Sequence, residues 1–116
     1  MIVCLVDDLM FSVKITTAAK ALGVPIHVER APDRVLDTIR EKQPSLVIFD
    51  LNSVRLRPME TLAALAADPG LRTVRTLGYV SHVDTATIEA ARQAGIGQVL
   101  ARSAFTSRLG EILTAG

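Results

Sequence analysis

Residues 2–8 read IVCLVDD, an apolar run that leads directly into two aspartates, Asp7 and Asp8. A second run of the same kind, residues 46–50, reads LVIFD and ends in Asp50. Short runs rich in β-branched residues predict strands that are buried on both faces. The carboxyl ends of parallel strands meet at one edge of a sheet, so the two runs predict an acidic edge.

The rest of the chain alternates between short apolar runs and longer segments with helical spacing. Strands are predicted at residues 2–6, 25–28, 46–49, 76–80 and 98–101. Helices are predicted between and after them, the last one from the spacing of Phe105, Leu109, Ile112 and Leu113. Five such repeats predict an α/β fold, a doubly wound (βα)5 domain with one parallel sheet. We expect the flavodoxin-like strand order 2-1-3-4-5.

Polar residues and glycines mark the expected ends of several helices. Asp84 and Ser103 suit the N-caps of the fourth and fifth helices. Gly23 and Gly95 follow the expected ends of the first and fourth helices, where glycine commonly ends a helix. These positions indicate short connections between the predicted elements.

The composition fits a single domain and excludes several classes of protein. The 116 residues suit one domain, residues 1–116, with a core that is aliphatic because aromatic residues are only 3% of the chain. The net charge of +1, from 13 basic and 12 acidic residues, gives no electrostatic argument for binding nucleic acid or a membrane surface.

The cysteine content and the apolar runs predict the cellular compartment of the protein. Cys4 is the one cysteine, and it stands in an apolar run where a small buried side chain is expected. Asp7 and Asp8 interrupt the first run before a signal peptide could form, and no run approaches the ~18 residues of a membrane helix. We therefore expect a soluble, cytoplasmic protein.

The predicted acidic edge combines residue types that suit phosphoryl chemistry. Asp7, Asp8 and Asp50 would repel each other, and a hard divalent cation such as Mg²⁺ would relieve that repulsion. A carboxylate can act as a nucleophile toward a phosphoryl group and form an aspartyl-phosphate. Ser81, after the fourth strand, and Arg102, after the fifth, offer a hydroxyl and a cation for the phosphoryl oxygens.

This set of residues resembles the receiver domain of two-component response regulators. The paired aspartates after the first strand, Asp50 after the third, Ser81 after the fourth and Arg102 after the fifth follow the order of that family's motifs. The resemblance covers essentially the whole chain, including the Ala-Gly pair at residues 94–95 before the fifth strand.

The resemblance implies a role for each residue of the acidic edge. Asp50 would be the phospho-acceptor, and Ser81 would be the switch hydroxyl. Mg²⁺ would be held by the side chains of Asp8 and Asp50, by Asp7 partly through water, and by the backbone carbonyl of Asn52. Arg102 stands where the family has a lysine, which would contact the phosphoryl group.

The resemblance also implies partners and a mode of action. The phosphoryl donor would be a sensor histidine kinase, a phosphotransfer protein or a small phosphodonor. The chain would be a signalling module and not an enzyme, with an unidentified downstream protein as its target. The surface made by the fourth helix, the fifth strand and the fifth helix would change on phosphorylation, and it could also form a homodimer.

The sequence departs from the family's pattern at several positions. Arginine replaces lysine at Arg102, and Ser103 replaces a proline, so the family's cis peptide is expected to be missing there. His82 replaces a small residue and could restrict access to the pocket, and Val99 replaces an aromatic switch residue. These changes support an alternative, a degenerate receiver that docks to proteins without phosphorylation.

Other charged residues have simpler interpretations. A solvated surface is expected for the arginines between residues 55 and 75, with docking to an acidic partner as the less favoured alternative: Arg55, Arg57, Arg72 and Arg75. His27, on the predicted second strand, is expected to be a structural edge residue. His82 lacks a partner histidine or cysteine at ligand spacing, which argues against a metal role.

Two other classes with a similar architecture fit the sequence less well. Flavin mononucleotide binders hold phosphate in a loop after the first strand, where Asp7 and Asp8 would repel it. Phosphatases of the haloacid-dehalogenase type need two aspartates one residue apart, whereas in this chain they are adjacent.

Overall fold

The strands of the computed structural model form one parallel sheet in the order β2-β1-β3-β4-β5, as predicted. The structure describes residues 1–81 and 84–116, so the prediction about His82 lies outside the described residues. Each strand agrees with its predicted range to within one residue at either end: β1 Ile2–Leu5, β2 Ile26–Val28, β3 Leu46–Asp50, β4 Arg75–Val80 and β5 Gln98–Ala101. The doubly wound α/β fold is therefore confirmed.

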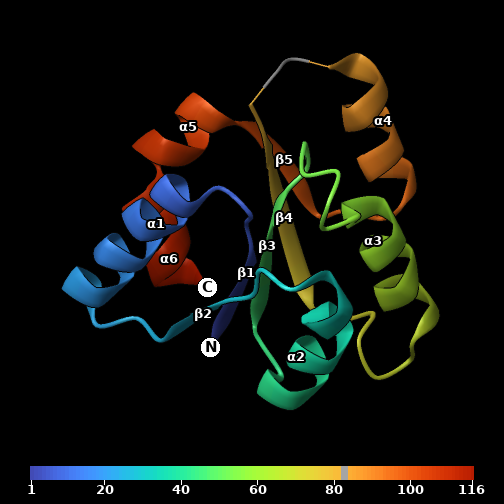
Figure 1. Cartoon of the computed structure of the whole chain (residues 1–116), viewed down its shortest axis with the longest axis horizontal. Helices are drawn as coiled ribbons and strands as arrows, with labels where there is room; N and C mark the ends of the chain where they lie inside the picture. The colour runs from blue at the N-terminus through green and yellow to red at the C-terminus, as the bar shows by residue number, and fades with distance from the viewer. Residues whose placement is uncertain (82–83) are drawn as a thin grey trace.

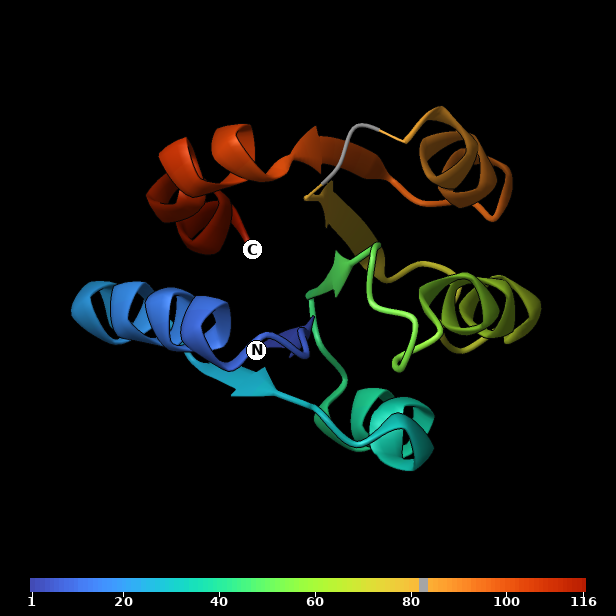
Figure 2. The same ribbon diagram turned by 45° about the horizontal axis from the view of Figure 1, so that its top comes forward.

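Helices cover both faces of this sheet (Figure 1). One face is covered by α1 (Leu9–Leu22), α5 (Arg102–Ser107) and α6 (Leu109–Ala115). The other face is covered by α2 (Val35–Lys42), which a 3₁₀ turn at Pro32–Arg34 precedes, α3 (Pro58–Ala67) and α4 (Thr85–Gln93). Figure 2 shows the three layers, with the strands between the two groups of helices.

Successive side chains of the central strands point to opposite faces of the sheet, and this divides the core into two halves. In β1, Cys4 belongs to the cluster on the α1 face, whereas Val3 and Leu5 belong to the cluster on the α2 face. In β3, Ile48 and Phe49 divide in the same way. Both faces of these strands are fully buried, which explains why the two strands were recognisable as unbroken apolar runs.

The C-terminal helical region differs from the prediction of one capped helix. Arg108, with φ −105° and ψ 10°, separates α5 from α6, although its N–H still donates to the Ala104 carbonyl (3.1 Å). The predicted N-cap at Ser103 is wrong, because α5 begins at Arg102 directly after β5. The predicted N-cap at Asp84 is confirmed, since its carboxylate accepts from the N–H of Ala86 (3.0 Å).

Two further predictions about the backbone can be assessed over the described ranges. Gly23 and Gly95 have positive φ, 68° and 95°, which glycine adopts without steric cost at the ends of α1 and α4. Across residues 1–81 and 84–116 the peptide bonds are trans, as expected from Ser103 in place of proline. Within the same ranges no helix combines the length and apolarity needed to cross a membrane.

Substitution of two glycines tests the close packing of β5 against β4. A methyl group on Gly97 would lie 2.7 Å from the Thr76 carbonyl oxygen, whereas one on Gly110 of α6 meets nothing nearer than Leu22 Cδ1 at 3.9 Å. Gly97→Ala is expected to lower the free energy of unfolding by about 1–3 kcal/mol, and Gly110→Ala to raise it by about 0.5 kcal/mol. Urea denaturation measures both. Wild-type stability of Gly97→Ala would contradict this close approach of the two strands.

Candidate functional site

The pairing of β1 with β3 brings the predicted acidic residues to one edge of the sheet. Leu5 of β1 lies opposite Phe49 of β3, so Asp7 and Asp8 leave the sheet beside Asp50, the last residue of β3. Strands β4 and β5 run parallel to β1 and β3 (Figure 1). Ser81, which follows β4, and Arg102, which follows β5, are therefore at the same edge. The predicted location at the carboxyl ends of the strands is therefore correct.

Asp8 has two partners, and both favour its ionised form. Its Oδ1 accepts from the backbone N–H of Phe11 (3.1 Å) and thereby caps the N-terminus of α1. Its Oδ2 lies 3.3 Å from the Nη2 of Arg102. The pKa of Asp8 is lowered, and the hydrogen bond from the Phe11 N–H is the largest cause. Burial opposes this effect, whereas Arg102 and the backbone N–H of Met10 lower the pKa further.

Arg102 reaches the acidic edge because an aromatic cluster supports it. Its guanidinium carbon lies 4.0 Å from the centre of the Phe11 ring, a cation–π contact. Phe11 in turn packs on Tyr79 and Phe105, with ring centres 5.0 and 5.9 Å away. The guanidinium therefore contacts both a carboxylate and an aromatic face, which suits arginine better than lysine.

Asp7 is paired with an arginine that the sequence did not assign to the site. The Nη1 of Arg55, from the loop after β3, lies 3.0 Å from Asp7 Oδ1 and also donates to the backbone carbonyl of Arg30. The Nη2 of Arg30 donates to the Asp7 carbonyl (3.4 Å). Arg55 is exposed, in agreement with the prediction of a solvated surface, but it also makes an ion pair with Asp7 that the sequence does not predict.

The neighbouring arginines behave differently from Arg55. Arg57 makes longer ion pairs with Glu60 (3.8 Å) and Asp33 (4.0 Å), and Arg75 donates to the Ala115 carbonyl (3.1 Å). The position of Arg55 five residues after Asp50, in the loop at the carboxyl edge, was the signal in the sequence that could have identified it.

Asp50 is the least compensated of the three carboxylates. Its side chain is half-buried, and its Oδ1 accepts from the backbone N–H of Asn52 (3.0 Å). Within the described residues it makes no ion pair. Burial is the main cause that raises the pKa of Asp50, and the negative charges of Asp8 and Asp7 raise it further, against the lowering effects of the Asn52 N–H and Arg102.

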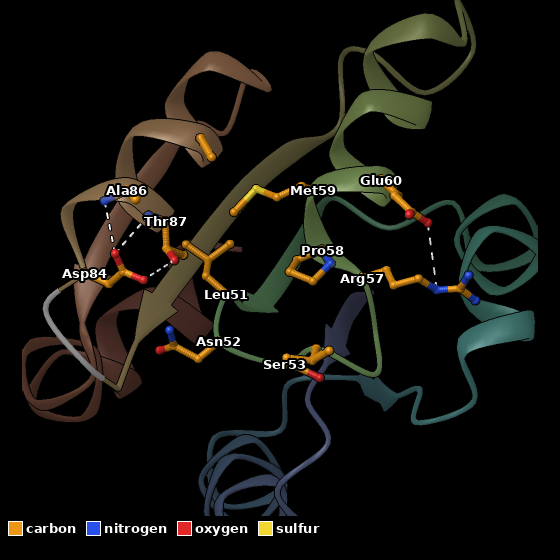
Figure 3. Close-up of a pocket in the computed structure, with 12 residues that line it drawn as sticks. Leu51, Asn52, Ser53, Arg57, Pro58, Met59, Glu60, Asp84, Ala86 and Thr87 are labelled. Atoms are coloured by element: carbon orange, nitrogen blue, oxygen red, sulfur yellow. Dashed lines mark hydrogen bonds and ion pairs between the residues drawn. The ribbon is translucent and has the colours of Figure 1, made fainter.

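Asn52 joins the loops that follow β3 and β4. Its side-chain Oδ1 accepts from the backbone N–H of Ser81 (2.6 Å), a contact that the sequence does not predict. Ser81 itself is exposed beside the acidic edge. Figure 3 shows Asn52 at one side of an adjoining pocket of ≈ 550 Å³, which the loop after β3, α3 and α4 enclose.

The residue types of the acidic edge fit a hard divalent cation, because carboxylate and carbonyl oxygens are its preferred ligands. Asp7 and Asp8 are close enough to affect the pKa of Asp50. Across residues 1–81 and 84–116, however, no three side chains from aspartate, glutamate, histidine or cysteine converge as a ready ion site. Asp7 and Asp8 are directed toward Arg55 and Arg102 instead.

Solved structures of response-regulator receiver domains share this fold. One is the receiver domain of a sensor histidine kinase from Pseudomonas aeruginosa PAO1 with a magnesium ion coordinated in the active site cleft, which matches with a TM-score of 0.83 and 17% identity over 98% of this chain and 93% of that one. Another is a response regulator from Hahella chejuensis, with a TM-score of 0.85 and 13% identity over 97% and 91% of the two chains.

The phosphorylated cyanobacterial phytochrome response regulator RcpA also matches, with a TM-score of 0.73 and 20% identity over 98% of this chain and 89% of that chain. The sequence matches no protein-family model and no curated protein. At these identities the comparisons establish the receiver fold, and the resemblance inferred from the sequence is confirmed at that level.

Replacement of Asp50 tests the charge balance of the acidic edge. Because its pKa is raised in the folded protein, ionised Asp50 destabilises the fold, and this cost grows as the pH rises from its unfolded pKa through its folded pKa. After allowance for screening by solvent, Asp50→Asn is expected to raise the free energy of unfolding by about 1 kcal/mol at pH 7, and the gain should disappear toward pH 3. Urea denaturation with EDTA at several pH values measures this.

Asp8→Asn is the control with the opposite sign. Its lowered pKa means that ionised Asp8 stabilises the fold, and that this stabilisation is lost as the pH falls through its folded pKa. The variant is expected to be less stable than the wild type at pH 7. If Asp50→Asn and Asp8→Asn shifted stability in the same direction, the opposite environments assigned to these two carboxylates would be wrong.

Proposed function

We propose that residues 1–116 form a receiver-like domain of two-component signalling that accepts a phosphoryl group on Asp50. One observation supports this most strongly: Asp50 is a half-buried carboxylate at the end of the central strand β3, without an ion-pair partner among the described residues, and two carboxylates and a guanidinium stand around it. The donor would be a sensor histidine kinase or a phosphotransfer protein.

The chemistry proposed for Asp50 is direct transfer to a carboxylate oxygen. The oxygen forms a bond to phosphorus while the bond from phosphorus to the donor nitrogen or oxygen breaks, and the donor leaves with that electron pair. The raised pKa of Asp50 indicates a carboxylate that is poorly neutralised by its surroundings. Arg102, held in place by Asp8 and Phe11, supplies positive charge near the transferred group.

A divalent cation, proposed to be Mg²⁺, would offset the charge that gathers at this edge during transfer. Its ligands would be Asp7, Asp8, Asp50 and the backbone carbonyl of Asn52. A magnesium ion in the cleft of the Pseudomonas aeruginosa receiver domain supports this assignment. The carboxylate and carbonyl oxygens present in this chain are of the type that Mg²⁺ prefers.

The response to phosphorylation would pass through Ser81. Asn52 links the loop after β3 to the start of the loop after β4 by a hydrogen bond to Ser81. A movement of Ser81 toward the phosphoryl group would therefore alter the position of α4. Ala91 is the one residue of α4 that is buried, and the remaining residues of α4 are half-buried or exposed. We propose that this surface, with β5 and α5, contacts a downstream protein in the cytoplasm or a second copy of the chain.

A second candidate function is phosphorylation-independent docking. The observation that favours it is the compensation of Asp7 by Arg55 and of Asp8 by Arg102, which balances two of the three carboxylates without an ion. A receiver fold in which arginines already balance two of the three carboxylates could serve as a constant binding surface.

Phosphoryl uptake distinguishes the two functions. Incubation with acetyl phosphate and Mg²⁺ is expected to add one phosphoryl group, about 80 Da, to the wild-type protein and none to Asp50→Asn. Asp37→Asn, on the exposed side of α2, is the matched control and should gain the same mass as the wild type. Intact-protein mass spectrometry measures all three.

Two outcomes would count against Asp50 as the acceptor. A mass gain that persists in Asp50→Asn would place the phosphoryl group elsewhere. Absence of uptake by the wild type, with Mn²⁺, long incubation and phosphorylated histidine kinases as donors, would favour the docking module.

A further inference from the structure

We propose that Arg55 is the protein's own counter-ion for Asp7 at the acidic edge, and that a divalent ion must displace Arg55 from Asp7 in order to bind. The inference rests on the cation site proposed at Asp7, Asp8 and Asp50. It goes further in assigning to Arg55 control over the affinity of that site.

The loop after β3 is folded so that Arg55 is directed toward Asp7. Leu56 is buried, with 3% of its surface exposed, and anchors the loop in the core. The N–H of Leu56 donates to Ser53 Oγ (3.2 Å), and the N–H of Arg57 donates to the Val54 carbonyl (3.3 Å). These contacts make residues 53–57 a compact turn, which limits where the Arg55 side chain can extend.

Although Arg55 is exposed, its guanidinium contacts two oxygens of the acidic edge. Its Nη1 bridges Asp7 Oδ1 (3.0 Å) and the Arg30 carbonyl, so it interacts with one charged and one neutral oxygen. Carboxylate and carbonyl oxygens are also the ligands that a hard metal ion selects. The Nη2 of Arg30 donates to the backbone carbonyl of Asp7 (3.4 Å), so arginines contact both the side chain and the backbone of Asp7.

The pair of Arg55 with Asp7 can open without disturbing the core. The side chain of Arg55 is 55% exposed and that of Asp7 is 33% exposed, and ion pairs at such positions are weak and screened by solvent. A guanidinium carries one positive charge, whereas a divalent ion carries two and can interact with Asp7 and Asp50 together. A divalent ion can therefore replace the Arg55 guanidinium at Asp7. The free energy of ion binding is then less favourable by the free energy of the lost Arg55–Asp7 pair.

Comparison of two arginine variants tests this competition. Arg55→Gln and Arg57→Gln remove the same charge from the same loop, but Arg57 pairs with Glu60 and Asp33 and makes no contact with Asp7. Titration with MnCl₂, with free Mn²⁺ followed by electron paramagnetic resonance, measures the dissociation constant. Arg55→Gln is expected to bind Mn²⁺ about two- to fivefold more tightly than Arg57→Gln, whose affinity should stay near the wild-type value.

A third variant and a structural check complete the experiment. Arg55→Lys keeps the charge but removes the guanidinium whose Nη1 contacts both Asp7 and the Arg30 carbonyl, so its affinity should lie between those of the wild type and Arg55→Gln. Circular dichroism melts show whether each variant is folded. Equal affinity of Arg55→Gln and Arg57→Gln, including the case in which neither binds Mn²⁺, would overturn the proposal.

The role of Arg55 and the phosphorylation of Asp50 can be tested independently. Tighter binding by Arg55→Gln in a protein that takes up no phosphoryl group would support the displacement of Arg55 and refute phosphorylation. Uptake on Asp50 with no difference between the two arginine variants would support phosphorylation and refute the role of Arg55.

Discussion

The pairing of β1 with β3 at the centre of the sheet is the constraint on which the acidic edge depends. Both strands are buried on both faces. Their register, with Leu5 opposite Phe49, determines which residues lie side by side where the two strands end. Asp7, Asp8 and Asp50 are therefore neighbours because of the apolar residues that precede them. The hydrophobic contacts of the two strands stabilise an arrangement of charges that would be unfavourable alone.

The three carboxylates of the acidic edge are stabilised in three different ways. Asp7 pairs with Arg55, and Asp8 pairs with Arg102 while it caps α1. Asp50 is stabilised by a backbone N–H and otherwise has a raised pKa because of burial and its negative neighbours. This difference in environment separates Asp50, which has no ion-pair partner among the described residues, from two carboxylates that pair with arginines. Phosphoryl transfer to Asp50, as proposed, would need such a division of roles.

The sequence was sufficient for the sheet and for the location of the edge, because apolar runs and strand order depend on local patterns and on general rules of connection. It was insufficient for Arg55, since the contact with Asp7 joins residues 48 positions apart through a turn whose shape depends on burial of Leu56. The N-cap prediction at Ser103 failed because α5 follows β5 without a connecting residue. The helix break falls at Arg108, a residue type that does not by itself predict a helix end. The partners of Arg102 also required the fold, since Asp8 and Phe11 lie over ninety residues away in the chain.

The most direct test of the acidic edge as a cation site is paramagnetic broadening by Mn²⁺ in a ¹H–¹⁵N spectrum of the ¹⁵N-labelled protein. Broadening is expected to centre on the backbone amides of Asp8, Asp50 and Asn52, and the Arg55 Nε–H signal should change as its pair with Asp7 opens. Broadening centred instead on the exposed acidic residues of α2, or no localised broadening at all, would contradict a cation site at this edge of the sheet.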